Sequence, residues 1–472
     1  MPGYRTLQDL VDAHPDLVGY FFNETQAPHS RARATLSAPF VPSEFTNWRD
    51  EQRAWRESAA LFDQSHHMPE LFISGPDARR VLTSVTITSL ANLTPDRAKQ
   101  FIACAPNGKV IGDCVLYDLG GGRYELVSGQ TVLDWVEYQV ISGGYDAVVE
   151  RDPSSPFTTS GGRVSYRYQI DGPSAGEILA AAIDGEMPQI PFFRTARVTI
   201  AGRPVLLLRH GMAGHHGAEI SGPFEDRDMV RDRILKAGAG HGLVPGGTRA
   251  YFSSIYESGW MAYPLPAIYT GEGLRGFREW LPGDGWDAST SIAGSYRAPA
   301  IEDYYLDPWQ LGYGRILKLD HDFIGREALE KAADKPHRTR VTLVWNRDDV
   351  TTVFASQFGD GPRYKALEFP VADYGFPQAD EVRDSHGELI GISSHCGYSN
   401  NEGEMLSLAM LDAAAAQPGT DVIIVWGEPG GGSRKPHVER HEQTTIRATV
   451  APAPYAAAVR QLKRQGFGAG SP

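Results

Sequence analysis

The chain has 472 residues, which is long for one compact domain and favours two or three. Hydrophobic residues at 41% and charged residues at 22% exclude wholesale disorder. The formal net charge of −13 disfavours nucleic acid as a partner, because no excess of lysine and arginine is available to neutralise phosphates.

Cysteine usage and hydropathy indicate the compartment. Cys104, Cys114 and Cys396 are too few for a disulfide framework and show no C-x-x-C spacing, so we expect reduced thiols. The N-terminus lacks the pattern of a signal peptide, and no stretch reaches the roughly 18 apolar residues of a membrane span. We therefore expect a cytoplasmic protein that uses no membrane and no obligate protein partner.

The first half of the chain alternates helical and strand-like patterns. A short amphipathic pattern occupies 7–17, and apolar residues recur at helical spacing from Trp48 to Phe62. Residues 69–150 alternate strand-like runs such as ELFIS and RYELVS with helical runs such as VLDWVEYQVIS. This alternation predicts an α+β fold.

Two further regions follow. Proline, serine and glycine concentrate at 153–162, as in a linker between lobes. Residues 163–250 give a second α+β set. From about 338, the runs RVTLVWN, ELIGISS, LSLAMLD and DVIIVWG are separated by turn residues and predict a small β-barrel.

Four segments carry a family resemblance. They are LFDQSHHM at 61–68, NGKVIGD at 107–113, HGMAGHHGAEISGP at 210–223, and the region from YFSSIYESGW at 251–260 to GYGRILKLDHDFIGREAL at 312–329. Their order and spacing resemble the glycine-cleavage T-protein (aminomethyltransferase) family. Within that family the chain is most similar to the tetrahydrofolate-dependent vanillate and syringate O-demethylases, with which it shares ESGW, PLPAIYTG, REWLP and IEDYY.

The resemblance implies a three-lobed cloverleaf with folate at its centre. The first lobe is expected to combine residues 1–66 with 160–250, and the second to combine 67–159 with 251–335. Residues 336–472 are expected to form the C-terminal β-barrel.

Three residues match cofactor-binding positions of the family. Glu219 would accept a ring N–H and the adjacent amine of the pterin; the alternative is a surface glutamate where a loop meets a strand. Trp260 would supply a flat apolar wall, and its alternative is a core tryptophan at a domain seam. Gln169 would contact folate or, alternatively, satisfy buried backbone groups.

Catalytic roles are expected for Tyr251, His67 and Asp113. Tyr251 matches the tyrosine near the substrate methoxy group, where a hydroxyl would stabilise or protonate the leaving oxygen. Its alternative is a packed aromatic bonded to a backbone carbonyl. Asp113 stands where T-proteins carry a paired acidic signature, but the first member of the pair is Gly112 here. The family's L-R-x-E-x-G also reads SIYESG, without its arginine, so a demethylase-type site is favoured over glycine cleavage.

The histidine pairs do not predict a metal site. Adjacent histidines at 66–67 and 215–216 lack the i, i+4 spacing of a helical zinc site, and no cysteine or carboxylate cluster accompanies them. By resemblance His67 lines the substrate side, with Gln64 beside it.

The substrate half of the site departs from the vanillate enzymes. Their two tyrosines before EFTNW fall on Leu36 and Ala38, and their carboxylate-binding arginine falls near Gly129 and Gln130. Arg31, Arg33 or Arg297 could supply a replacement cation, but the sequence places none of them. We expect another methoxy-arene, or a methylated metabolite without that carboxylate.

The sequence therefore predicts a tetrahydrofolate-dependent O-demethylase that acts on a small methylated substrate. A folate-dependent N-demethylase or a biosynthetic one-carbon transferase is the alternative on the same fold. A non-catalytic folate-binding protein of the iron–sulfur-assembly type is disfavoured, because its K-G-C-Y-x-G-Q signature is missing.

Overall fold

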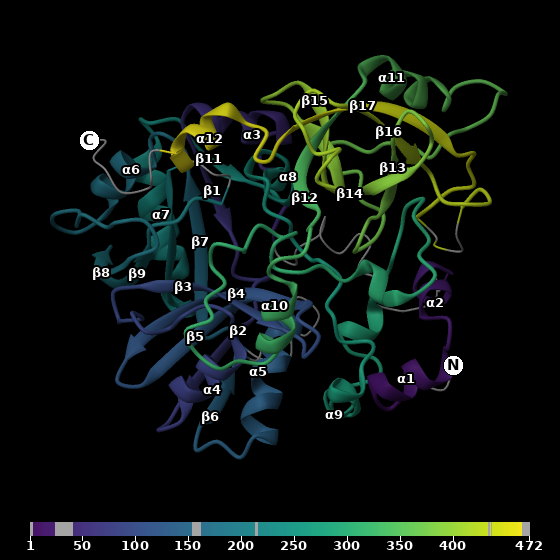
Figure 1. The fold of residues 1–472 in the computed structure, drawn as a ribbon. Helices are drawn as coiled ribbons and strands as arrows, with labels where there is room; N and C mark the ends of the chain where they lie inside the picture. The colour runs from purple at the N-terminus through teal and green to yellow at the C-terminus, as the bar shows by residue number, and fades with distance from the viewer. Residues whose placement is uncertain are drawn as a thin grey trace.

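The computed structural model describes residues 3–23, 41–152, 162–212, 216–432, 435 and 437–464. Two open sheets and one closed barrel form three lobes around a common centre (Figure 1). Helices flank both sheets. This arrangement confirms the predicted α+β cloverleaf with a C-terminal barrel.

The first lobe contains a six-stranded sheet in the order β11-β1-β7-β10-β9-β8. Its strands are β1 (Ala59–Asp63), β7 (Ser165–Asp171), β8 (Thr195–Ile200), β9 (Arg203–Leu208), β10 (Gly217–Pro223) and β11 (Leu243–Gly246). Helices α6 (Ala175–Ala182) and α7 (Arg227–Gly238) bury Ile178 and Ile234 in one cluster with Tyr168 and Ile220 of the sheet. Strand β7 is buried on both faces: Tyr168 and Ile170 pack on the side of α6 and α7, and Arg167 and Gln169 are buried on the opposite face.

The predicted helix over 48–62 is wrong in its second part. Helix α3 (Trp48–Glu57) ends at Ser58, and β1 begins at Ala59. The residues from Ala59 to Phe62 are all buried, because the two faces of β1 are both covered. Ala59 and Leu61 pack in the cluster of α6 and α7, and Ala60 and Phe62 pack with Trp55 of α3. A strand buried on both faces shows no alternation, so its sequence continued the helical pattern.

The second lobe contains a five-stranded sheet in the order β3-β4-β5-β2-β6. Its strands are β2 (Glu70–Ser74), β3 (Ala98–Cys104), β4 (Val110–Gly120), β5 (Arg123–Ser128) and β6 (Val148–Arg151). Helices α4 (Ala78–Val85) and α5 (Gln130–Ser142) pack on it through Leu82 and Leu133. Helix α10 (Arg326–Ala332) packs on the turn before β4, where Leu329 adjoins Gly108.

The first two helices pack with the second lobe. Leu7 and Phe21, from α1 (Leu7–Ala13) and α2 (Leu17–Asn23), share a core with Phe277 of α9 (Arg275–Trp280) and with Leu71 of β2. Figure 1 shows α1, α2 and α9 on the same side of the molecule. Sequence analysis assigns residues 1–66 to the first lobe. We propose instead that the first lobe begins near α3.

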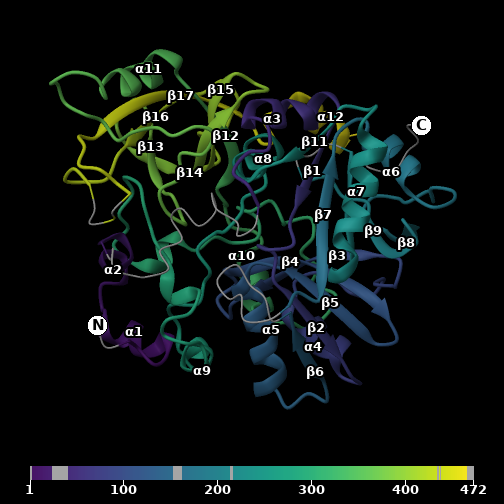
Figure 2. The same ribbon diagram turned by 180° about the vertical axis from the view of Figure 1, so that it is seen from behind.

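The third lobe is a closed barrel in the order β12-β15-β14-β13-β16-β17. Its strands are β12 (Thr339–Trp345), β13 (Asp380–Arg383), β14 (Leu389–Ser399), β15 (Glu404–Leu411), β16 (Asp421–Trp426) and β17 (Thr444–Pro452). Helix α11 (Arg347–Ala355) covers it on the outside, whereas α12 (Ala457–Arg464) returns to lie near α3 (Figures 1 and 2).

Helix α8 (Thr248–Ser258) is held between the first lobe and the barrel by Glu257. The Glu257 side chain is 1% exposed and accepts hydrogen bonds from Trp55 (3.1 Å), Arg56 (2.7 Å), Ser399 (2.9 Å) and Asn401 (2.9 Å). A buried carboxylate with four donors fixes the helix rigidly, because each bond to a charged group is strong.

In the described residues, no helix has the length and apolarity needed to cross a membrane.

Candidate active site

Three side chains lie in one row across the first sheet. Phe62 of β1 is directly opposite Gln169 of β7, and Gln169 is directly opposite Glu219 of β10. Directly opposed residues project from the same face of a sheet. The structure therefore brings the two predicted cofactor residues of this sheet together.

Glu219 is buried and already partnered on one oxygen. It is 5% exposed, and its Oε1 accepts hydrogen bonds from Arg167 and from the hydroxyl of Tyr117. The surface alternative is wrong. A buried carboxylate needs hydrogen-bond donors, and Arg167 and Tyr117 supply them to one oxygen of Glu219.

Arg167 joins the two sheets through a cluster that sequence reasoning missed. Its guanidinium contacts Glu125 of β5 at 2.5 Å and Glu70 of β2 at 3.0 Å, and it also pairs with Glu219. Burial raises the pKa of Glu125 to about 7, and Glu70 and Glu219 add to the effect, whereas Arg167 opposes it. The available signal was a charged residue inside each of the strand-like runs SYRYQID, RYELVS and ELFIS.

Gln169 satisfies buried backbone, as one of its two predicted roles requires, and its contact with folate stays a prediction. Its Nε2 donates to the carbonyl of His210 (2.9 Å) and to Asp171 (2.9 Å). Its Oε1 is buried and has no hydrogen-bond partner within the described part of the chain. The amide thus satisfies backbone on one side and leaves an acceptor available on the other.

Trp260 and Asp113 are connected by a tyrosine. The indole N–H of Trp260 donates to the hydroxyl of Tyr313 (3.1 Å), which donates to Asp113 (3.0 Å). Trp260 is 43% exposed, so the core alternative is wrong. Burial raises the pKa of Asp113 to about 6, although hydrogen bonds from Tyr313 and Gln100 oppose the shift. Sequence reasoning missed Tyr313, because it stands 200 residues from Asp113.

Tyr251, His67 and Gln64 form one polar group at the start of α8. The Tyr251 hydroxyl lies 2.8 Å from His67 Nε2 and 3.2 Å from Gln64 Nε2. Burial raises the pKa of Tyr251 and lowers the pKa of His67 to about 3, so both are neutral near pH 7. The Tyr251 hydroxyl therefore contacts two side chains. The alternative prediction, in which it binds a backbone carbonyl, is wrong.

The structure describes only part of the residues predicted for the substrate wall. Leu36 and Ala38 lie outside the described residues. Gly129 caps α5 and faces the ring of Tyr263, and Gln130 donates to Asp134 at 2.9 Å. Arg297 lies 3.8 Å from Asp16, and no contact joins it to Tyr251.

Metal ligands do not gather in the described residues. No group of three or more histidine, cysteine or acidic side chains there has a geometry that could hold a metal ion. His67 uses its Nε2 on Tyr251. His215 lies outside the described residues.

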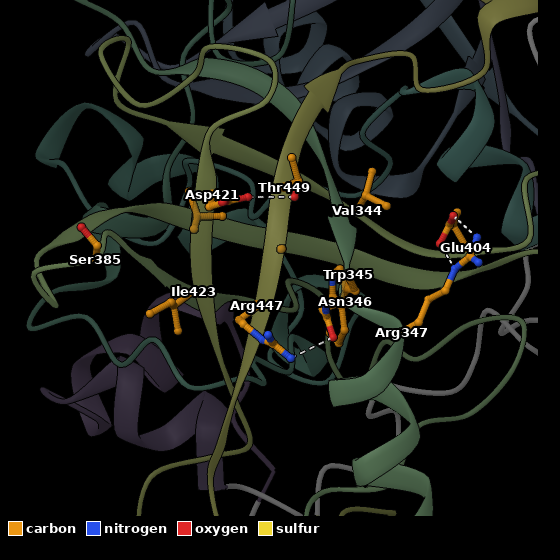
Figure 3. A pocket seen from close by; sticks show the side chains of 12 residues that line it. Val344, Trp345, Asn346, Arg347, Ser385, Glu404, Asp421, Ile423, Arg447 and Thr449 are labelled. Atoms are coloured by element: carbon orange, nitrogen blue, oxygen red, sulfur yellow. Dashed lines mark hydrogen bonds and ion pairs between the residues drawn. The ribbon is translucent and has the colours of Figure 1, made fainter.

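A separate hollow of 540 Å³ lies on the barrel (Figure 3). Its polar side chains bind one another, with Arg347 at 2.6 Å from Glu404 and Thr449 at 3.0 Å from Asp421. None of the predicted site residues lines this hollow. It is therefore distinct from the candidate active site.

Comparison with known proteins identifies the family. The model of the GCVT N-terminal domain matches residues 21–265. The chain belongs to the GCVT aminomethyltransferase family. It is 44% identical to syringate O-demethylase from Sphingobium sp. over 97% of both chains, and 31% identical to sesamin methylene transferase from Sinomonas sp. over 88% of this chain and 90% of that one.

The fold has a solved counterpart in the same family. Aminomethyltransferase T of the glycine cleavage system from Bartonella henselae superposes with a TM-score of 0.58 at 17% identity, covering 87% of this chain and 90% of that chain. This likeness confirms the fold that the sequence predicted.

Proposed function

We propose that the chain is a tetrahydrofolate-dependent O-demethylase, which moves the methyl group of a small methoxylated aromatic compound to N5 of tetrahydrofolate. The family relationship supports the cofactor, and the 44% identity to an enzyme named for an aryl methyl ether supports the reaction. Gly112 and the missing arginine in SIYESG weigh against glycine cleavage.

One observation carries the proposal. Gln64 Oε1, His67 Nδ1 and Gln169 Oε1 are buried, and none has a hydrogen-bond partner within the described ranges. Buried polar atoms are almost always paired in native proteins, and exceptions call for a ligand or ordered water. All three belong to residues that were predicted for this site.

These residues fit a flat heterocycle that carries N–H donors. Glu219 and the free Oε1 of Gln169 supply acceptors, and the exposed face of Trp260 supplies an apolar wall. When bound, tetrahydrofolate supplies the N5 lone pair that forms the new bond to the methyl group, and the N5 proton is released. The protein's part is to orient this ring and exclude water.

Tyr251 acts on the other side of the transfer. As the methyl–oxygen bond breaks, its electron pair stays on the ether oxygen, which gains a proton to become a hydroxyl. The Tyr251 hydroxyl is protonated at neutral pH and is held by His67 and Gln64, so it can donate to that oxygen.

We also propose a cytoplasmic location, which the three buried cysteines without disulfide bonds support.

The test begins with titration of the purified protein with tetrahydrofolate. Methoxylated arenes with and without a carboxylate follow, and 5-methyltetrahydrofolate is detected as product. We expect folate binding and transfer from at least one arene. Binding without transfer would redirect the search to N-methyl donors or to the reverse reaction, and no folate binding would refute the proposal.

A further inference from the structure

The Arg167 side chain sits where the two sheets meet. It projects from β7 two residues before Gln169 and therefore on the same face of the strand. It is 1% exposed, and each of its three nitrogens has an acceptor: Nε and Nη2 contact Glu70, Nη2 contacts Glu125, and Nη1 contacts Glu219. A single guanidinium thus fixes three carboxylates from three different strands.

The charges around Arg167 do not balance. Three carboxylates and the hydroxyl of Tyr117 face this guanidinium, and the next ion pair, Arg163 with Asp152 at 3.4 Å, adds no net charge. The charge of Arg123 also acts on Glu125, and the charge of Glu219 acts on His210. Burial alone would lower the pKa of Arg167, but Glu219, Glu125 and Glu70 raise it instead. The arginine therefore stays charged.

We propose that Arg167 is a positioning residue of the folate site, which holds the Glu219 carboxylate in the orientation in which it accepts the N–H donors of the pterin. The inference rests on the proposed function. Arg167 and Tyr117 both bind Oε1, and Oε2 of Glu219 makes no hydrogen bond within the described residues. The carboxylate is thus anchored through one oxygen and offers the other.

The orientation of Glu219 depends on this anchor. Arg167 Nη1 and the hydroxyl of Tyr117 both bind Oε1 and hold the carboxylate in one position. Without Arg167, only the hydroxyl of Tyr117 would hold the Glu219 side chain. Oε2 would then no longer be fixed where it meets the donors of the pterin, so the affinity for folate would fall.

The experiment measures the dissociation constant of tetrahydrofolate. Arg167→Met is expected to raise it about 10²-fold. Arg167→Lys keeps the positive charge but loses the planar guanidinium with its several donors. It is therefore expected to bind folate more tightly than Arg167→Met and more weakly than the wild type. Arg278→Lys is the matched control, because Arg278 is 4% exposed and binds backbone carbonyls and Gln8 in the second lobe. It is expected to match the wild type.

A double-mutant cycle separates positioning from a structural role. In a Glu219→Gln background, which has no carboxylate to position, Arg167→Lys or Arg167→Met is expected to cause less than about threefold further loss. Losses that multiply would overturn the inference. If Arg167→Met does not fold, the lysine variant completes the cycle. Failure of the wild type to bind folate would instead remove the proposed function.

Discussion

Two groups of buried charges differ in their balance. In the barrel, two lysines lie with two carboxylates: Lys365, Lys435, Glu428 and Asp380. At the seam of the first two lobes, two arginines lie with four carboxylates: Arg163, Arg167, Glu70, Glu125, Asp152 and Glu219. The barrel cluster has as many lysines as carboxylates, whereas the seam cluster has two more carboxylates than arginines.

The difference separates a structural cluster from a functional one. A balanced buried cluster has nothing to gain from a ligand. Excess buried acceptors destabilise the empty protein, and a ligand with N–H donors offsets that penalty. The imbalance therefore supports our proposal that the seam is part of the binding region.

Removal of the barrel cation is expected to give the largest effect. Lys365 Nζ lies 2.7 Å from Glu428 and is fully buried, so Lys365→Met leaves carboxylates without compensation. We expect a loss of about 3–5 kcal/mol in unfolding free energy, measured by denaturant unfolding, with unchanged folate affinity in the folded protein. Lys331→Met, at an exposed ion pair, is the control and should change stability by less than about 0.5 kcal/mol. Equal stability of both variants would contradict the structural role of the barrel cluster.

Removal of a seam carboxylate is expected to act in the opposite way. Glu219→Ala deletes the acceptor for the pterin, so the dissociation constant of tetrahydrofolate should rise about 10³-fold. The melting temperature should not fall as it does for the barrel variant, because the substitution relieves the excess of negative charge. Glu225→Ala, at an exposed carboxylate just after β10, is the control for calorimetric titration. Unchanged affinity in Glu219→Ala would sink the pterin assignment.

Tyr251 provides a third case, a polar group without net charge. Tyr251→Phe removes the donor to the leaving oxygen, so kcat should fall about 10²-fold, while folate affinity stays within about twofold. Tyr256→Phe on the same helix loses a hydrogen bond to the carbonyl of Cys396 and should lower stability but not kcat. Single-turnover kinetics distinguish the two. Wild-type kcat in Tyr251→Phe would show that the hydroxyl takes no part in the reaction.

The smallest effect is a dependence of stability on pH. The pKa of Glu125 is about 7 in the fold, against about 4.3 for an exposed glutamate. Because the folded pKa is raised, this contribution to stability is complete below pH 4 and is lost as the pH rises to 7. Glu125→Gln should therefore melt about 2 °C above the wild type at pH 8 and lose that advantage by pH 5. Parallel melting curves from pH 5 to pH 8 would contradict the shift.

The sequence predicted the fold and placed residues that the structure brings together. Motif resemblance located Glu219, Gln169 and Tyr251, because each belongs to a continuous segment of characteristic spacing. It did not locate Arg167, whose partners lie 42, 52 and 97 residues away. A charged residue inside an apolar strand signals a buried partner, but only the packing of the two sheets identifies that partner.

The substrate wall was the least accessible part of the site. Leu36 and Ala38 came from counting along the chain without gaps, which gives positions but not contacts. Gly129 and Gln130 were predicted because they stand where the vanillate enzymes have an arginine. The absence of that arginine does not reveal which groups bind the substrate in its place. Tyr263, which faces Gly129, had no motif to mark it.

The order of the strands along the chain has a consequence for biosynthesis. Glu70 and Glu125 belong to a sheet whose five strands are all synthesised before β7 brings Arg167. Until then the nascent second lobe holds its buried carboxylates without their counter-ion, and it also awaits α9 to complete its core. The barrel has all its strands in one continuous segment. We therefore expect a fragment of this enzyme ending near residue 152 to be unable to fold alone, while the barrel is the part best suited to independent expression.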